Sequence, residues 1–216
     1  MLDKENNKNK FILALHSTND YFGFGYKDLG NNYNDNFLIK PLDKDLSKNL
    51  VINLSDFLKE KQLHSIERIS VSIGPANFNA SRQIIVCARA IAQQINCSLD
   101  KFNSFQIMAK RIALKNNIFD NNQHFWIFRK LKTRGYIAGK YYILNQENNN
   151  SKFDIKEIVS PRLFKNLSEK ENKFEAEDDI KLELQELLKL SLINHKHLIP
   201  NHWENVLPIY PIDPIN

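Results

Sequence analysis

The most constraining feature of the sequence is residues 11–15 (FILAL), a continuous apolar run of strand length. Successive side chains of a strand point to opposite faces, so an all-apolar strand is typical of a sheet that is covered on both faces. The polar segment 16–20 follows it, and residues 21–26 are rich in aromatic, strand-forming types. Residues 16–20 are types that bond their own backbone, so we predict a tight hairpin turn there.

Helices and strands then alternate. We predict a strand over 37–40, a helix over 43–61, a strand over 69–73 and helices over 78–95 and 104–115. The first of these helices carries, at the spacing of one helical face, Leu46, Leu50, Leu54, Phe57 and Leu58. Asp43 is placed to cap its start. This order predicts a mixed sheet with a crossover helix, and therefore an α/β fold.

The helix predicted over 78–95 is apolar on more than one face. One face carries Ile84, Ile85, Ala88, Ile91, Ala92 and Ile95. Another carries only small residues, namely Ala80, Cys87 and Ala90. A helix that is apolar on two faces must bury two faces. One face covers the sheet, and the other faces a second helix or another protein.

The second half of the chain has a weaker pattern. We predict strands over 124–128, 136–144 and 153–159, with a disordered loop over the Asn-rich residues 146–152. A helix is predicted over 179–193. The segment 206–215 has a proline at every third position, so it is extended and cannot be a central strand.

The composition argues against a membrane-spanning or secreted protein. No apolar run approaches the roughly 20 residues that span a bilayer, and the polar start lacks the apolar core of a signal peptide. We therefore expect a cytoplasmic protein with no membrane contact, in which residues 1–10 form a disordered tail. The net charge of +5 permits RNA contact but is spread along the chain. Cys87 and Cys97 have no CxxC spacing, and Cys87 is expected to be a buried free thiol.

A search for catalytic motifs finds none. The turn at Gly74 feeds a helix N-terminus, where phosphates often bind, but it has one glycine and Pro75 removes a donor. His16 follows the first strand, where nucleotide-binding proteins of this layout place a carboxylate for the metal. Histidine cannot replace a carboxylate for a hard cation, which counts against ATP hydrolysis. No nucleophile with an evident base is found, so we expect no catalytic residues and no cofactor.

Metal ligands are not placed to form a site. His195 and His197 are two apart and do not share a helix face, and Pro200 precedes His202. Asp178 and Asp179 are interpreted as charges at a helix N-terminus. We therefore expect no metal.

The segment 46–95 reads LSKNLVINLSDFLKEKQLHSIERISVSIGPANFNASRQIIVCARAIAQQI. It resembles the TsaB (YeaZ) family, in which a leucine-rich helix and a strand lead into GPGSFTGLR and a helix of small residues. The residues that match this motif in register are Gly74, Pro75, Phe78 and Arg82. FILALHSTND resembles the family's ILALDTST hairpin, and residues 133–139 resemble its ARRGEVY strand. The proline-rich end is similar to that of cyanobacterial-type members.

The resemblance implies an actin-like ATPase fold of two ribonuclease-H-like lobes with mixed sheets, the second degenerate. We expect lobes over 11–115 and 116–216. It also implies a non-catalytic subunit that supports the threonylcarbamoyltransferase TsaD in modifying tRNA at position 37, together with the ATPase TsaE. The chain would contact tRNA only indirectly, and a homodimer is plausible when TsaD is absent. The expected partner interface is formed by Leu50, Leu54, Phe78, Ala80, Arg82, Cys87 and Ala90.

The sequence departs from the family at two places. The family's aspartate in the first hairpin is His16, and GPGSFTGLR has become GPANFNASR, with loss of two glycines. Helix faces need no glycines, so the departures affect nucleotide contact more than a partner interface. Two alternatives remain: an ATP-dependent enzyme of the same fold, and a free-standing RNA binder.

Overall fold

The protein is described here from a computed structural model, which covers residues 10–30, 35–59, 61–118, 120, 123–145, 153–169 and 171–211. The chain divides into two compact units. The first unit contains residues 1–102 and 179–208, and the second contains residues 103–178 and 209–216. The expected tail over 1–10, except Lys10, and the expected loop over 146–152 lie outside the described residues.

The first unit is a five-stranded mixed sheet with strand order β3-β2-β1-β4-β5. Its strands are β1 (Phe11–Ser17), β2 (Tyr21–Asp28), β3 (Asp35–Pro41), β4 (Ile66–Ser72) and β5 (Ser98–Phe102). Its helices are α2 (Leu46–Phe57), α3 (Phe78–Ile95) and α5 (Ile180–Lys196). The hairpin β1–β2 is antiparallel, as predicted, whereas β4 runs parallel to β1 and to β5.

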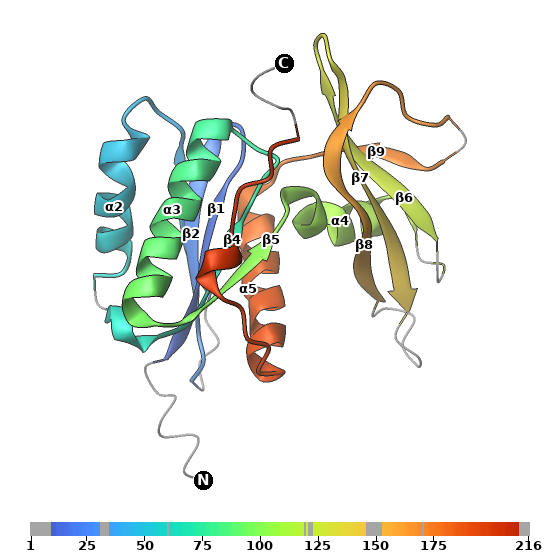
Figure 1. The fold of residues 1–216 in the computed structure, drawn as a ribbon. Helices are drawn as coiled ribbons and strands as arrows, with labels where there is room; N and C mark the ends of the chain where they lie inside the picture. The colour runs from blue at the N-terminus through green and yellow to red at the C-terminus, as the bar shows by residue number, and fades with distance from the viewer. Residues whose placement is uncertain are drawn as a thin grey trace. The chain divides into compact units, whose positions relative to one another are not determined.

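The central strand β1 is buried along its whole length because helices cover both faces of the sheet (Figure 1). Ser17 contacts Ser81 of α3, whereas the neighbouring His16 contacts Glu183 of α5. Alternate side chains of β1 therefore point to α3 and to α5. This arrangement explains why FILAL is apolar at every position.

The strand β2 lies close to α5 because of its glycines. A Cβ atom added at Gly23 would lie 3.0 Å from Leu184 Cδ1, and one at Gly25 would lie 3.3 Å from Leu188 Cδ1. The glycines of the aromatic segment 21–26 thus let a helix pack directly on the strand.

The helices of the first unit begin and end close to their predicted limits. The bounds of α3 are those predicted, and the Asn77 side chain caps it by accepting the Ala80 N–H at 3.2 Å. The predicted cap of α2 is wrong. The residue before α2 is Asp45, which makes no side-chain cap, and Asp43 instead accepts the N–H of Asp45. The strand β5 was not predicted, because its sequence, SLDKF, is short and half polar.

The second unit is a four-stranded sheet covered on one face by α4 (Ser104–Lys115). Its strands are β6 (His124–Leu131), β7 (Gly135–Asn145), β8 (Phe153–Phe164) and β9 (Lys173–Glu175), in the order β8-β7-β6-β9. The pairs β6–β7 and β7–β8 are antiparallel and β6–β9 is parallel. The bounds of α4 are those predicted.

The unit boundary differs from the predicted one. We expected lobes over 11–115 and 116–216, but α4 belongs to the second unit and α5 to the first. The apolar face of α5, with Leu184, Leu187 and Leu188, is buried in the first unit. The chain therefore leaves the first unit after β5 and returns to complete it, which a division by sequence order cannot anticipate.

Candidate functional site

An apolar groove of about 1070 Å³ lies in the first unit between α2 and α3. Its residues come from one face of α2, the loop that follows it and the face of α3 that points away from the sheet. Leu50, Leu54 and Leu58 form its floor, since each is at most 5 % exposed. Val51 and Val86 stand at its rim and are 64 % and 65 % exposed. Large aliphatic side chains at this exposure are typical of a surface that another molecule covers.

Most of the predicted interface residues line this groove. They are Leu50, Leu54, Arg82, Cys87 and Ala90. Their role in an interface stays a prediction. Phe78 and Ala80 do not line it. Ala80 is only 2 % exposed and belongs to the core, so its expected place among the small residues of an outer face is wrong.

Sequence reasoning missed several groove residues. Val51 and Val86 were overlooked because they lie outside the leucine and small-residue patterns that defined the faces. Ile91 and Ile95 were grouped on one face with Ile84, Ile85 and Ala88, but they line the groove, whereas those three are buried. Their signal was present in the spacing, since the pairs Val86–Ala90, Cys87–Ile91 and Ile91–Ile95 are each four positions apart and therefore adjacent on a helix surface.

The cysteines are both free, as predicted. Cys87 is only partly buried, less than expected. Burial raises the pKa of its thiol to about 11, so the thiol is neutral at physiological pH. Cys87 therefore adds an uncharged, weakly polar surface to the groove.

The motif loop between β4 and α3 forms a closed turn. Gly74 has φ of 91°, which favours glycine, and it precedes Pro75 through a cis peptide bond. The next residues are tied locally, because Asn77 caps α3 and its own N–H donates to the Thr18 carbonyl at 3.4 Å. Arg82 lies over the Phe78 ring, 5.0 Å from its centroid. This loop joins the first hairpin to α3.

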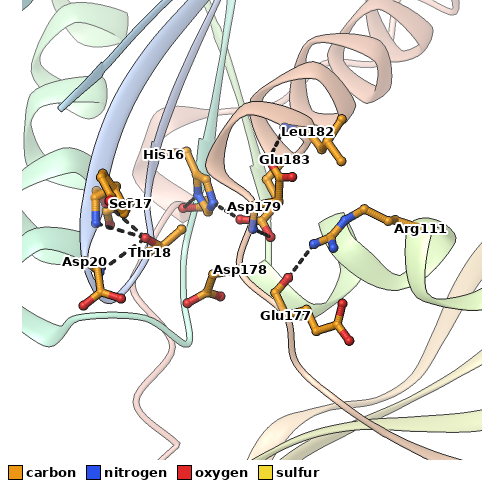
Figure 2. A network of polar contacts seen from close by, with 12 residues as sticks. His16, Ser17, Thr18, Asp20, Arg111, Glu177, Asp178, Asp179, Leu182 and Glu183 are labelled. Carbon is orange, nitrogen blue, oxygen red and sulfur yellow. Dashed lines mark hydrogen bonds and ion pairs between the residues drawn. The ribbon is translucent and has the colours of Figure 1, made fainter. Parts of the chain in front are cut away.

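A buried chain of polar side chains links the sheet to α5 (Figure 2). His16 Nε2 lies 2.7 Å from Glu183 Oε2, and His16 Nδ1 lies 2.5 Å from Ser72 Oγ. Glu183 Oε1 also accepts the N–H of Asp179 at 3.0 Å, and the Asp179 side chain accepts the Leu182 N–H and caps α5. A carboxylate beside one ring nitrogen orients the histidine so that the other faces the serine.

The structure corrects the statement that no nucleophile has a base nearby. Ser72, His16 and Glu183 have the residue types of a hydrolytic triad, and they lie 56 and 167 positions apart, so sequence spacing could not reveal them. All three are at most 1 % exposed. A substrate cannot reach Ser72 Oγ, so this arrangement holds α5 on the sheet.

A second buried cluster surrounds Asp100 of β5. Its carboxylate accepts from Arg68 at 2.7 Å and from three side chains of α5 and the following loop. These are Ser191 at 2.6 Å, Asn194 at 3.0 Å and Asn201 at 2.5 Å. Because a buried charge must be paired and hydrogen-bonded, the cluster explains how Asp100 is buried in β5, the edge strand of the sheet.

The structure also shows where the acidic residues Asp178 and Asp179 lie. Asp179 caps α5, as described above. Asp178 pairs with Arg129 at 2.6 Å in the second unit. In the same unit Arg111 donates a hydrogen bond to the Glu177 carbonyl (Figure 2). Among the described residues, no cluster of three His, Cys, Asp or Glu side chains could hold a metal ion. In the same part of the chain, no helix is both long and apolar enough to span a membrane.

The strand order of the first unit, with β2 antiparallel and β1, β4 and β5 parallel, defines a ribonuclease-H-like lobe of the actin-like ATPase fold. The smaller mixed sheet with one covering helix is the degenerate second lobe.

Two solved structures share this fold over nearly the whole chain. The chain is similar to YeaZ from Pseudomonas aeruginosa, with a TM-score of 0.67, 14 % identity and coverage of 93 % of this chain and 99 % of that chain. It is also similar to an uncharacterised Pseudomonas aeruginosa protein described as similar to peptidase YeaZ, with a TM-score of 0.70 and 13 % identity. That match covers 94 % of this chain and 100 % of the other. No family model and no curated protein matches the sequence. The protein therefore has the fold of YeaZ.

Proposed function

We propose that this chain is a TsaB-type, non-catalytic subunit that binds a TsaD-like threonylcarbamoyltransferase in the cytoplasm. The transferase modifies tRNA at position 37, a TsaE-like ATPase joins the complex, and in this role the groove links the chain to tRNA indirectly, through the transferase. The observation that carries the proposal is the apolar groove between α2 and α3. The YeaZ fold and the in-register Gly74, Pro75, Phe78 and Arg82 support it.

The groove suits a helical partner. Val51 and Val86 project from the rims, so an apolar ridge seated between them removes both from water. The small side chain of Ala90 allows a partner backbone to come close. Arg82 and Lys59 at the edge supply a charged border, as at other specific interfaces.

The mechanism is a shift of the partner's conformational equilibrium. A subunit that binds one conformation of the transferase better than the others raises the population of that conformation by its difference in affinity. The chemistry belongs to the partner, and this chain contributes a rigid apolar surface. That surface is rigid because α3 packs on the sheet through Ile84, Ile85 and Ala88, each at most 1 % exposed.

Co-purification with the TsaD-like protein of the same organism tests the proposal. Wild-type chain should be retained by the tagged partner, and Val86→Asp should abolish retention, because a carboxylate cannot be buried unpaired in an apolar interface. Leu182→Asp is the matched control, since Leu182 is 44 % exposed on α5, outside the groove. Circular dichroism establishes that both variants fold. A wild-type chain that is not retained overturns the proposal.

The same surface predicts self-association when the partner is absent. Light scattering of the isolated chain over a range of concentrations should show a dimer that Val86→Asp dissociates and Leu182→Asp preserves. Addition of the TsaD-like protein should replace this homodimer with a heterodimer. A dimer that neither the variant nor the partner affects would use another surface.

The non-catalytic role is tested at Ser72. Ser72→Ala removes the hydroxyl beside His16, so a reconstituted threonylcarbamoyl transfer should proceed at the wild-type rate if this serine is structural. The isolated chain should likewise hydrolyse no ester or peptide. A hydrolysis that Ser72→Ala abolishes would instead identify an enzyme.

A further inference from the structure

The sheet of the second unit has large aromatic side chains on the face opposite α4, here called the outer face. Cross-strand register defines it, because directly paired residues point to the same side. On β6 and β7 the pairs His124–Tyr142 and Trp126–Lys140 lie on this face, while the pair Phe125–Tyr141 faces the core. Phe128 shares the outer face with Ala138, its partner on β7.

The rings of the outer face form contacting pairs. Trp126 and Phe164 meet edge-on with centroids 5.2 Å apart, although β7 separates their strands. The small side chain of Ala138, which lies between β6 and β8, leaves room for this contact. Phe128 and Tyr136 make a second edge-on pair at 5.6 Å. The rings are only partly buried, so they form an extended and accessible aromatic surface.

Basic side chains surround these rings. Arg162 lies over the Phe164 ring, 5.1 Å from its centroid, and Lys140 lies over Trp126 at 5.5 Å. The basic members of the face, by register, are Lys130, Lys140, Lys156, Arg162 and Lys173, against the acidic Asp154 and Glu175. Arg162 and Lys156 are exposed and make no ion pair with any residue that the structure describes.

One carboxylate next to the face is already occupied. Glu171 accepts a hydrogen bond from the Trp126 indole N–H at 2.7 Å and pairs with Lys140. The Lys140 and Trp126 hydrogen bonds hold the pKa of Glu171 below its usual value. The indole edge is therefore satisfied and the ring is held in place, while Arg162 and Lys156 keep their charge available.

We propose that the outer face binds single-stranded RNA. Unpaired bases stack on exposed rings, and this contact tolerates any sequence because every base has a flat face. The basic side chains meet the phosphates of the same strand. RNA is favoured over DNA because unpaired loops and ends are the usual targets of RNA-binding surfaces. An apolar protein surface is a poorer fit, since it would bury Arg162 and Lys156 without partners.

This proposal does not depend on the TsaD-like partner. It concerns contact of this chain itself with RNA, through a unit that does not contain the α2–α3 groove. Retention by the partner therefore tests one proposal, and RNA binding by the isolated chain tests the other.

The test is fluorescence anisotropy of the full chain with a labelled single-stranded RNA of about 12 nucleotides, repeated with the same strand in a duplex. The double variant Lys156→Glu/Arg162→Glu should weaken single-strand binding at least tenfold. It should also reduce the slope of log affinity against log salt concentration by about one for each phosphate that is no longer neutralised. Tyr142→Ala should weaken binding about tenfold, because it removes a ring on which a base stacks. Lys181→Glu on α5 is the control for a simple change of charge, since Lys181 is exposed and lies in the first unit.

Intrinsic fluorescence gives an independent measurement. The chain has two tryptophans, so in a Trp203→Phe background only Trp126 reports. Stacked bases should quench Trp126 at the RNA concentrations that raise the anisotropy. Absence of binding at low salt overturns the proposal. Equal weakening by Lys181→Glu, or equal affinity for the duplex, also overturns it, because either result indicates unspecific attraction without stacking.

Discussion

The two units of the molecule distribute polar and apolar side chains in opposite ways. The first unit buries ionisable side chains, with His16, Arg68, Asp100 and Glu183 each at most 5 % exposed, while Val51 and Val86 of its groove are exposed to solvent. In the described part of the second unit, buried polar residues are confined to Asn103 and Ser104. Its ion pairs lie at the surface, and cationic side chains lie over its partly buried rings Trp126 and Phe164.

The contrast indicates different roles for polar side chains. In the first unit the buried polar side chains connect the sheet, which is otherwise apolar, to α5, which follows the second unit in the sequence. The apolar residues that remain outside are then available for a partner. In the second unit α4 packs on the sheet mainly through apolar side chains, with the Tyr141–Asn103 hydrogen bond at its start, and most polar side chains are available at the surface.

The largest expected effect comes from Asp100→Asn. This change leaves the Arg68 charge buried without its counterion, so the free energy of unfolding should fall by about 3–5 kcal/mol in chemical denaturation. Asp178→Asn makes the same chemical change at the surface pair with Arg129 and should lower it by less than about 1 kcal/mol. Arg68→Met/Asp100→Leu removes the unpaired charge but leaves Ser191, Asn194 and Asn201 without their acceptor, so it should recover only part of the loss. Equal effects of the two single variants would remove the contrast between the units.

The next effect concerns the groove. Ala90→Trp fills it, so affinity for the TsaD-like protein should fall at least tenfold, or about 1.4 kcal/mol, with unfolding unchanged. Lys181→Trp adds the same ring on α5 and should leave affinity as it is. The measurement is calorimetric titration of the partner. Unaltered binding by Ala90→Trp would show that the partner does not enter the groove.

A smaller effect is expected from Tyr141→Phe in the second unit. The Tyr141 hydroxyl donates to Asn103 Oδ1 at 2.9 Å in the interior, so its removal should lower the free energy of unfolding by about 1 kcal/mol. Burial, assisted by the Glu157 charge, raises the pKa of Tyr141 well above its usual value. Wild-type stability contributed by this group is therefore complete below pH 10, the ordinary tyrosine pKa, and is lost as pH rises toward the higher folded pKa.

The change in the free energy of unfolding at alkaline pH distinguishes Tyr141 from the other tyrosines. In Tyr141→Phe the additional loss of stability above pH 10 should disappear, while the loss from other groups remains. Denaturation at pH 8 and at pH 10.5 measures it. An unchanged pH dependence would mean that Tyr141 ionises in the folded protein.

The smallest effect is expected for Glu177→Gln. The Lys115 ammonium holds the pKa of Glu177 below its usual 4.5, but the pair is exposed and screened. The variant should therefore lose only a few tenths of a kcal/mol in free energy of unfolding. This loss should be present at neutral pH and absent once the pH falls below the pKa of Glu177 in the folded protein. A loss comparable to that of Asp100→Asn would show that surface pairs hold the second unit together.

The local structure of the chain follows closely from its pattern. The bounds of α3 and α4 are those predicted, and the structure shows that the side chain of the preceding asparagine caps each helix. The hairpin β1–β2 was predicted from an apolar run and a turn of self-bonding residues. β5 could not be predicted, because Asp100 breaks its pattern and is stabilised by Arg68, 32 positions away, and by side chains 91 to 101 positions away.

The site was predicted in part for the same reason. Leu50 and Leu54 were selected from their helical spacing, Cys87 and Ala90 as small residues of one helix face, and Arg82 from the family motif. All five line the groove, and their role in an interface stays a prediction. The buried placement of Ala80 and the exposure of Val86 depend on how α3 is rotated over the sheet, and side-chain spacing alone does not set that rotation. The chain Ser72–His16–Glu183 depends on contacts between three separate elements.

The return of α5 to the first unit has a consequence for synthesis on the ribosome. At about 5–20 residues per second, translation of residues 103–179 takes on the order of 4–15 seconds after β5 has emerged. Throughout that interval one face of the first sheet has no helix over it, and His16 and Asp100 lack the partners that α5 and its loop supply. The strands of the second sheet are all translated before α5 is, so the nascent chain exposes an unfinished first unit for a chaperone to recognise while the unit encoded in its middle can already fold.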